Sequence, residues 1–173
     1  MKNSVKVITT LVVVVALLSC SGNKNLTPYK GALSDLVPEK VGGFQRETAK
    51  YTVPPEILNL LKPVGDYSVS YKDSSGKEVT LAVLNFNSDK EAEYAFQKLQ
   101  EHLNSLTGGA RILEGGSAAK GYVQISKRML YQTDPDEAGS IWVDGSVMFI
   151  TKLDCQCSTA AASVRAFEFD FPY

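Results

Sequence analysis

The stretch that decides the fold is Val-Thr-Leu-Ala-Val-Leu-Asn-Phe-Asn-Ser-Asp-Lys-Glu, residues 79–91. Residues 79–86 are largely apolar on both faces of the strand that they predict, which is typical of a strand in the centre of a sheet. Ser88 and Glu91 then form a capping box, in which the serine side chain accepts a hydrogen bond from the third backbone N–H of a helix and the glutamate reaches back. We therefore expect a central strand that leads directly into a helix.

The helix expected from Ser88 onward has a single apolar stripe. Its apolar residues recur at the spacing of one helix face, and they are Ala92, Ala95, Phe96, Leu99, Leu103 and Leu106. Gly108 and Gly109 follow, and glycine commonly ends a helix. Because such a stripe has to be buried, the helix is predicted to pack on a sheet.

The residues before the central strand predict a hairpin and a short helix. Residues 67–71 alternate apolar and polar side chains, and residues 73–76 are turn formers, so this strand should pair with the central one. A short helix is expected over residues 54–61, because proline suits the first turn of a helix. Further upstream, a turn at residues 42–43 leads into a short strand that begins at Phe44.

The second half of the chain predicts further strands and a final helix. Strands are expected at residues 111–113, 121–132, 141–143 and 147–153, and a helix is expected over residues 159–168. Asp144 and Gly145 predict a type I′ turn between the last two strands, because both residue types tolerate a positive φ. Met129 and Tyr131 should share one face of the long strand.

Together these elements predict a single α+β domain over residues 33–173. Hairpin connections favour antiparallel pairing, and long crossovers dedicated to a parallel sheet are absent. We expect an antiparallel sheet of about five to seven strands with two main helices packed on one face, since each helix has one apolar stripe to bury.

Two strings within this domain resemble uncharacterised bacterial envelope domains that combine a strand, a helix and a tryptophan-containing hairpin. The strings are Phe-Asn-Ser-Asp-Lys-Glu-Ala-Glu-Tyr-Ala-Phe, residues 86–96, and Ile-Trp-Val-Asp-Gly-Ser-Val, residues 141–147. The resemblance implies an α+β envelope domain and brings no assigned activity.

The N-terminus has the pattern of an export signal. Two lysines precede an apolar run over residues 7–18, which is shorter than the ~20 residues of a membrane-spanning helix. Leu17, Ser19 and Cys20 then resemble the lipobox of bacterial lipoproteins. The resemblance implies that the chain is cleaved before Cys20.

Cleavage at this point would leave a lipid-anchored protein in the bacterial cell envelope. By the same resemblance, Cys20 carries fatty acyl chains such as palmitate, and two or three chains give a stable membrane anchor. Residues 1–19 are then a signal peptide, and residues 20–32 are the lipidated cysteine with a flexible tether. Ser21 is compatible with the outer membrane if the organism is Gram-negative.

The charge of the chain argues against nucleic acid as a partner. Removing residues 1–19 takes away two lysines and no acidic residue, so the mature chain carries 16 basic and 19 acidic residues, a net charge of −3. Nucleic-acid binding calls for a basic stripe, which this sequence lacks. The expected partners are the membrane, through the lipid anchor, and either an envelope protein or a small molecule.

Cys155 and Cys157 are the one group of residues that predicts chemistry of its own. Lipidation of Cys20 leaves them as the only thiols, and exported proteins meet an oxidising environment. If they precede the final helix, its N-terminus would lower a thiol pKa. The pair could be a redox couple, a local disulfide or two packed thiols. A bridge would be strained in an extended strand, where the two Cα atoms are about 6.6 Å apart.

No other group of residues predicts a catalytic or metal site. Zinc needs three or four ligands, whereas the chain has a single histidine, His102, at the border of the apolar stripe. Residues 134–139 hold three acids but lack the further ligands of an EF-hand. Phosphate-binding glycine loops and the Gly-x-Ser-x-Gly motif are absent. The sequence thus predicts no catalytic residue, no metal and no cofactor.

The expected function is therefore a non-enzymatic binding or interaction domain whose ligand the sequence does not identify. Trp142, Tyr122 and Tyr131 could form an aromatic ligand patch or pack in the core. A concave apolar pocket around Trp142 and Tyr131 would favour a small-molecule ligand. The alternative is a thiol-dependent redox protein that uses Cys155 and Cys157.

A Cys155→Ser/Cys157→Ser double variant is expected to fold and localise as the wild type does. Closing so short a loop removes few unfolded conformations, so a bridge would contribute well below the ~3 kcal/mol expected for a 15-residue loop. Thiol titration with and without reductant, together with thermal unfolding, checks this. A reduction potential at or above about −200 mV, combined with a phenotype in the double variant, would contradict the non-enzymatic interpretation.

Overall fold

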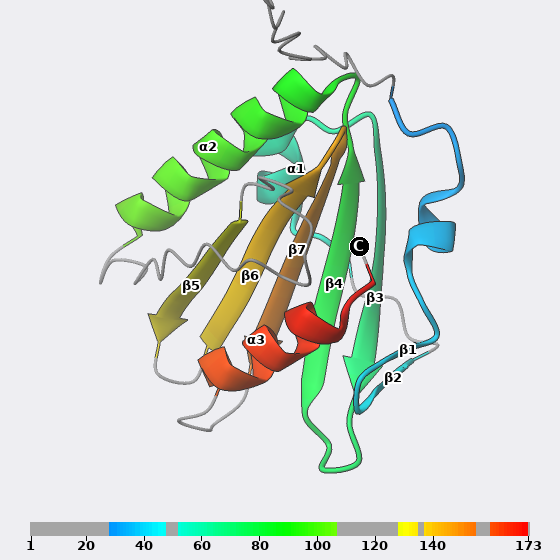
Figure 1. The fold of residues 1–173 in the computed structure, drawn as a ribbon. Coiled ribbons are helices and arrows are strands. Elements are labelled where there is room, and N and C mark those ends of the chain that lie inside the picture. Colours follow the sequence, from blue (N-terminus) through cyan, green and yellow to red (C-terminus); the bar gives the residue numbers. More distant parts are fainter. Residues whose placement is uncertain (1–27, 48–51, 107–127, 135–136, 155–159, 173) are drawn as a thin grey trace, which may run out of the picture.

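The structure is a computed structural model that describes residues 28–47, 52–106, 128–134, 137–154 and 160–172 (Figure 1). Within these residues no helix is both long and apolar enough to cross a membrane. The elements in chain order are η1 (Leu33–Leu36), β1 (Lys40–Val41), β2 (Phe44–Arg46), α1 (Pro55–Leu61), β3 (Gly65–Lys72), β4 (Glu78–Asn85), α2 (Asp89–Ser105), β5 (Arg128–Asp134), β6 (Glu137–Asp144), β7 (Val147–Asp154) and α3 (Ala160–Asp170).

The seven strands form one antiparallel sheet in the order β1-β2-β3-β4-β7-β6-β5. β4 lies in the middle, where it pairs with β3 on one side and with β7 on the other. These observations confirm the predicted α+β class, the antiparallel sheet and the central position of residues 79–86. The pairing of β4 with β7 joins the N-terminal half of the sheet to the C-terminal half.

Helices cover both faces of the sheet, which differs from the prediction that the two main helices pack on one face. In Figure 1, α3 crosses in front of the strands and α1 lies behind them. On β6, Trp142 belongs to the core beside α3, whereas Ile141 and Val143 belong to the core beside α1 and α2. Successive side chains of a strand point to opposite faces. Because the side chains on both faces of β6 are apolar, helices have to bury each face of the sheet.

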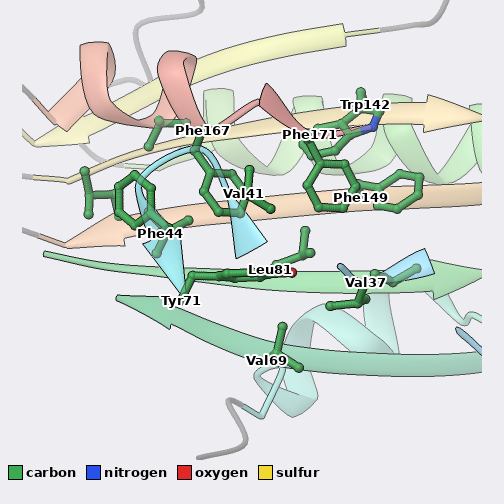
Figure 2. Packing of buried hydrophobic residues seen from close by; sticks show 14 of the residues in the cluster. Val37, Val41, Phe44, Val69, Tyr71, Leu81, Trp142, Phe149, Phe167 and Phe171 are labelled. Carbon is green, nitrogen blue, oxygen red and sulfur yellow. The ribbon is translucent and has the colours of Figure 1, made fainter. Parts of the chain in front are cut away.

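The first core, between the sheet and α3, is rich in aromatic rings (Figure 2). Trp142 stacks on Phe149 with ring centroids 5.0 Å apart, and Phe171 meets both rings edge-on. Phe167 of α3 lies 5.1 Å from the ring of Tyr71 on β3. Aromatic pairs of this kind each contribute about 0.5–1.5 kcal/mol beyond the area they bury. These contacts fix α3 on this face.

The second core lies between the opposite face of the sheet and the helices α1 and α2. The stripe predicted for α2 is buried there at Ala92, Ala95, Phe96, Leu99 and Leu103, whereas Leu106 is 40% exposed just beyond the helix. The capping box also forms, since Ser88 Oγ accepts a hydrogen bond from the Glu91 N–H at 3.2 Å. The Glu91 carboxylate reaches back to the N–H of Asn87 rather than to that of Ser88.

Tyr29, four residues before the predicted domain start at residue 33, contacts the sheet. The N–H of Tyr29 donates a hydrogen bond to Ser146 Oγ at 3.0 Å, and Asn85 Nδ2 donates to the Tyr29 carbonyl oxygen at 2.9 Å. The ring of Tyr29 also packs against the first core. Tyr29 falls within residues 20–32, which the sequence predicts as lipidated cysteine and tether, and these contacts join it to the sheet.

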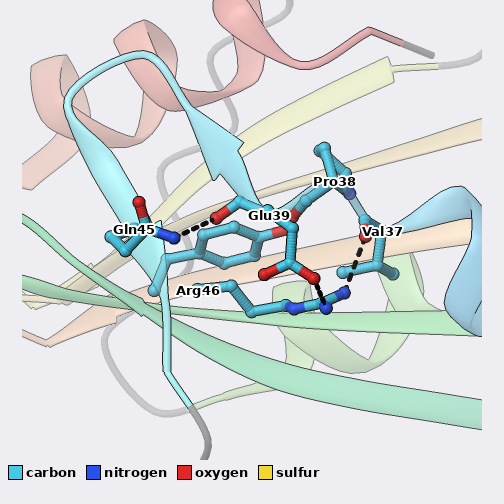
Figure 3. A network of polar contacts seen from close by, with 6 residues as sticks. Val37, Pro38, Glu39, Gln45 and Arg46 are labelled. Carbon is cyan, nitrogen blue, oxygen red and sulfur yellow. Dashed lines mark hydrogen bonds and ion pairs between the residues drawn. The ribbon is translucent and has the colours of Figure 1, made fainter.

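Residues 37–39 are fastened to the sheet by a polar network (Figure 3). Tyr71 Oη donates to the Pro38 carbonyl oxygen at 2.7 Å, and Arg46 Nη1 donates to the Val37 carbonyl oxygen at 2.9 Å. Arg46 also forms an ion pair with Glu39. Burial raises the pKa of Tyr71 well above its ordinary value, which Arg46 offsets in part. The phenol therefore stays protonated and remains a donor.

The β6–β7 hairpin turns one residue later than predicted. Asp144 pairs with Val147, so the two loop residues are Gly145 and Ser146 rather than Asp144 and Gly145. Gly145 has a φ of +58°, and Ser146 does not share this positive φ. Glycine with positive φ at the first loop position is typical of a type II′ turn instead of a type I′ turn.

The strand predicted at residues 141–143 begins earlier, because β6 starts at Glu137 and takes in residues predicted as a loop. The remaining predicted elements agree with the structure where it describes them. The short helix is α1, the final helix is α3, and Met129 and Tyr131 of β5 both lie in the second core. The strand expected at residues 111–113 and the first part of the strand expected at residues 121–132 lie outside the described residues.

Candidate functional site

A groove opens between α1, α2 and the second-core face of the sheet, and it encloses a cavity of about 150 Å³. One wall comes from α1 with the residues just before it, a second from the C-terminal half of α2, and the floor from four strands. The residues lining these three parts are, in turn, Val53, Pro54 and Ile57; Leu99 and Leu103; and Thr80, Ala82, Tyr131, Ile141, Ile150 and Lys152.

The groove exists because the helices leave part of the central strands uncovered. β4 and β7 lie in the middle of the sheet, yet Thr80, Ile150 and Lys152 are only partly buried. α1 has just seven residues, because Pro54 precedes it and Lys62 ends it in a left-handed conformation. A seven-residue helix is about 10 Å long, whereas an eight-residue strand extends about 26 Å. The helix therefore cannot cover the strands along their length.

Strand pairing sorts the floor of the groove into two rows. In the apolar row, Ile150 of β7 lies between its cross-strand partners Ala82 and Ile141. Thr80 of β4 and Lys152 of β7 are also cross-strand partners, each two residues away from the apolar row. This places them about 7 Å from that row, and they begin a polar row. The groove thus has an apolar end and a polar end.

Tyr131 completes the polar row by lying across Gly139. The two residues are cross-strand partners, and Gly139 in turn pairs with Lys152. The Tyr131 hydroxyl donates a hydrogen bond to the backbone oxygen of Thr151 at 3.3 Å. A Cβ atom at residue 139 would lie 2.3 Å from both the Tyr131 ring and that oxygen. Only glycine leaves room for the ring.

Lys152 is the single charged residue among the described residues that line the groove. Thr80 Oγ1 donates to the backbone oxygen of Lys152 at 3.3 Å, so its hydroxyl proton is used within the sheet. A lysine ammonium carries three donors and no acceptor. Lys152 therefore adds a cationic side chain to the polar end of the groove.

Of the aromatic residues considered for a ligand patch, Tyr131 lines the groove and Trp142 does not. Trp142 is 1% exposed in the first core, on the opposite face of the sheet, so the two residues share no pocket. Its indole N–H is buried with no hydrogen-bond acceptor among the described residues. Ring packing accounts for the position of Trp142. Tyr122 lies outside the part of the chain that the structure describes.

The remaining predicted site residues do not meet in the described structure. Cys20, Cys155 and Cys157 lie outside the described residues. His102 is partly buried on α2. Among the residues that the structure describes, no three or more histidine, cysteine, aspartate or glutamate side chains come together as a metal site.

Sequence reasoning missed Thr80 and Lys152, although the sequence holds a signal for both. Lys152 continues the alternation of Met148 and Ile150, and Thr80 precedes Ala82 on the same face of β4. A polar residue within an otherwise apolar strand face marks a place that the covering helices do not reach. What the sequence alone does not show is that the two residues are cross-strand partners.

Comparisons with known proteins bring no functional assignment. No protein family matches the chain, and no characterised protein matches it in sequence. In structure, the chain is similar to the extracellular domain of PknH from Mycobacterium tuberculosis, with a TM-score of 0.44 and 12% sequence identity. The alignment covers 76% of this chain and 78% of that chain.

A Gly139→Ala variant is expected to displace Tyr131 and to lower the free energy of unfolding by about 1–3 kcal/mol, because the added methyl group would overlap a ring and a backbone oxygen. Urea unfolding measures the loss. Gly43→Ala is the matched control, since no atom lies within 4 Å of a Cβ added there, and its effect should stay within about 0.5 kcal/mol. Equal stability of the two variants would contradict the role assigned to Gly139.

Proposed function

We propose that this protein is a lipid-anchored component of the bacterial cell envelope whose domain binds a small, largely apolar ligand in the groove. The observation that carries the proposal is the cavity of about 150 Å³ over the partly buried Ile150 at the centre of the sheet. Apolar surface left open to water costs free energy. A concave apolar site with a few polar groups is the usual form of a small-ligand site.

The groove favours binding over catalysis. The described residues that line it include no carboxylate, imidazole or thiol, and most of them are apolar. The Thr80 hydroxyl donates its proton to the backbone oxygen of Lys152, so that proton serves the sheet rather than a reaction. The alternative redox function rests on Cys155 and Cys157, and its support is the sequence alone.

The N-terminal contacts are compatible with an anchored domain whose groove stays accessible. Tyr29 follows Cys20 closely in the sequence and is held at one end of the sheet by Ser146 and Asn85. Thr80, in the polar row, lies five residues along β4 from Asn85, a distance of about 17 Å. The polar end of the groove thus lies away from the end of the sheet that Tyr29 contacts.

Metabolic labelling with a fatty-acid analogue tests the anchor. The wild-type chain is expected to take up label and to fractionate with membranes, because two or three acyl chains make binding effectively permanent. A Cys20→Ala variant should be unlabelled and should leave the membrane fraction. An unlabelled wild-type protein would show that the resemblance to lipoprotein signals misleads.

Binding of phenylpropanol, a neutral ligand with one aromatic ring, tests the groove. The sample is the mature chain, residues 20–173, with Cys20→Ala so that neither lipid nor detergent competes. Amide chemical shifts of the apolar row should move with a Kd of ~1 mM, as expected for a ligand of this size. Ala82→Phe should fill the cavity and weaken this binding by about tenfold or more.

The control carries the same substitution on the other side of the molecule. Ala166 is exposed on α3, so Ala166→Phe should bind phenylpropanol as the wild type does. Near-ultraviolet circular dichroism checks that both variants are folded. Shift changes in the wild-type protein that spread over the surface and avoid the groove would rule out the proposed site, whatever the variants do.

A further inference from the structure

On the basis of the proposed function, we infer that the natural ligand of the groove is a short apolar molecule whose polar group is a hydrogen-bond donor, a hydroxyl or an N–H. Its apolar part, a group of about the size of a benzene ring or a short acyl chain, lies on the apolar row. Its donor group binds the hydroxyl oxygen of Thr80 in the polar row.

The size of the apolar part follows from the cavity. Its volume is about 150 Å³, and an apolar cavity of about 150 Å³ can hold one benzene molecule. The described lining around this space is aliphatic on three sides, with Ile57 from α1, Leu99 and Leu103 from α2, and Ile150 from β7. Complete sites for larger ligands usually enclose about 300–1,000 Å³, so only one ring or a short chain fits.

The spacing of the two rows sets the separation of the two parts. Thr80 and Ala82 both line the groove and lie two residues apart on β4, so Thr80 is about 7 Å from the apolar row. A ligand that places a ring over the apolar row therefore brings a group on the third carbon beyond the ring within reach of Thr80. The hydroxyl of 4-phenylbutan-2-ol has this position, which makes the compound a suitable probe.

The direction of the hydrogen bond at Thr80 decides which polar group can bind there. Thr80 Oγ1 lies 3.3 Å from the backbone oxygen of Lys152, and because a carbonyl oxygen only accepts, the threonine hydroxyl is the donor. A hydroxyl has one proton and two lone pairs. Thr80 has therefore used its proton, and its oxygen can still accept. A ligand group that binds this oxygen has to supply the proton.

Thr80 is the lining residue on which this selection rests. The other polar side chains that line the groove within the described residues, Tyr131 and Lys152, have interactions of their own. The groove therefore selects for a donor proton rather than for a charge. Because Thr80 is only partly buried, water competes for its oxygen, and the effect is that of one ordinary hydrogen bond.

Two probes with the same carbon skeleton separate this inference from the proposed function. 4-Phenylbutan-2-ol donates and accepts a hydrogen bond, whereas 4-phenylbutan-2-one only accepts. The ketone and each enantiomer of the alcohol are titrated into the isotope-labelled mature chain with Cys20→Ala, and amide shifts in the groove give each Kd.

The titrations are repeated with Thr80→Val, Thr80→Ser and Ser70→Ala. Thr80→Val removes the hydroxyl and keeps the shape of the side chain, and Thr80→Ser keeps the hydroxyl. Ser70 is the cross-strand partner of Thr80 on β3 and is not among the described residues that line the groove. Ser70→Ala is thus the matched control for the loss of a hydroxyl.

We expect Thr80→Val to weaken the tighter-binding enantiomer of the alcohol by about fivefold and to weaken the ketone by less than about twofold. Thr80→Ser should retain the preference for the alcohol, and Ser70→Ala should bind both probes as the wild type does. Since the ketone reports on the same groove, it also shows whether each variant keeps an intact site.

Several results would overturn the inference. If Thr80→Val leaves the alcohol unchanged or weakens alcohol and ketone equally, the groove is a ligand site that does not select a donor through Thr80. The same conclusion follows if the ketone binds the wild type more tightly than both enantiomers, or if Ser70→Ala weakens the alcohol as much as Thr80→Val does. If neither probe moves groove amides, the proposed function fails as well.

Discussion

The structure depends on the pairing of β4 with β7, two strands whose side chains are apolar on both faces. Seven residue pairs, from Val79↔Leu153 to Asn85↔Val147, join them. Leu81 and Phe149 contribute to the first core, and Leu84 and Met148 contribute to the second. Each strand also continues into its own hairpin, β3–β4 on one side and β6–β7 on the other. Loss of this pairing would separate the sheet into two halves and open both cores.

The need to cover two faces explains the rest of the architecture, including the groove. The first core is closed by the aromatic rings of α3 and by the N-terminal segment from Tyr29 to Val37. On the other face, α2 covers the strands obliquely and α1 is short, so Ile150 remains partly exposed. The candidate ligand site is thus the part of the second core that the chain's own helices leave uncovered.

Much of the fold could be predicted from the sequence because its signals are local. The capping box at Ser88, the stripe of α2 and the alternation in β3 depend on residues close together in the chain. The same holds for the central strand, whose apolar character on both faces already implied cover on both sides. The prediction nevertheless put both main helices on one face of the sheet. It was wrong because the apolar stripe of a helix shows that the helix packs on a sheet but does not show on which face.

The candidate site was harder to predict because it depends on register. Whether Tyr131 and Trp142 share a pocket is decided by the pairing of Tyr131 with Gly139, which puts Tyr131 and Ile141 on the face opposite to Trp142. The meeting of Thr80 with Lys152 needs the pairing of strands far apart in the chain. A shift of one residue in pairing would have moved each side chain to the other face.

Native-state hydrogen exchange measures the central claim most directly. If the β4–β7 pairing holds the two halves together, the amides of residues 81–84 and 148–150 should be the slowest to exchange. They should also share one free energy of opening, equal to that of global unfolding. Faster exchange in these residues than in β5 and β6, or separate opening free energies for the β3–β4 and β6–β7 hairpins, would contradict the account.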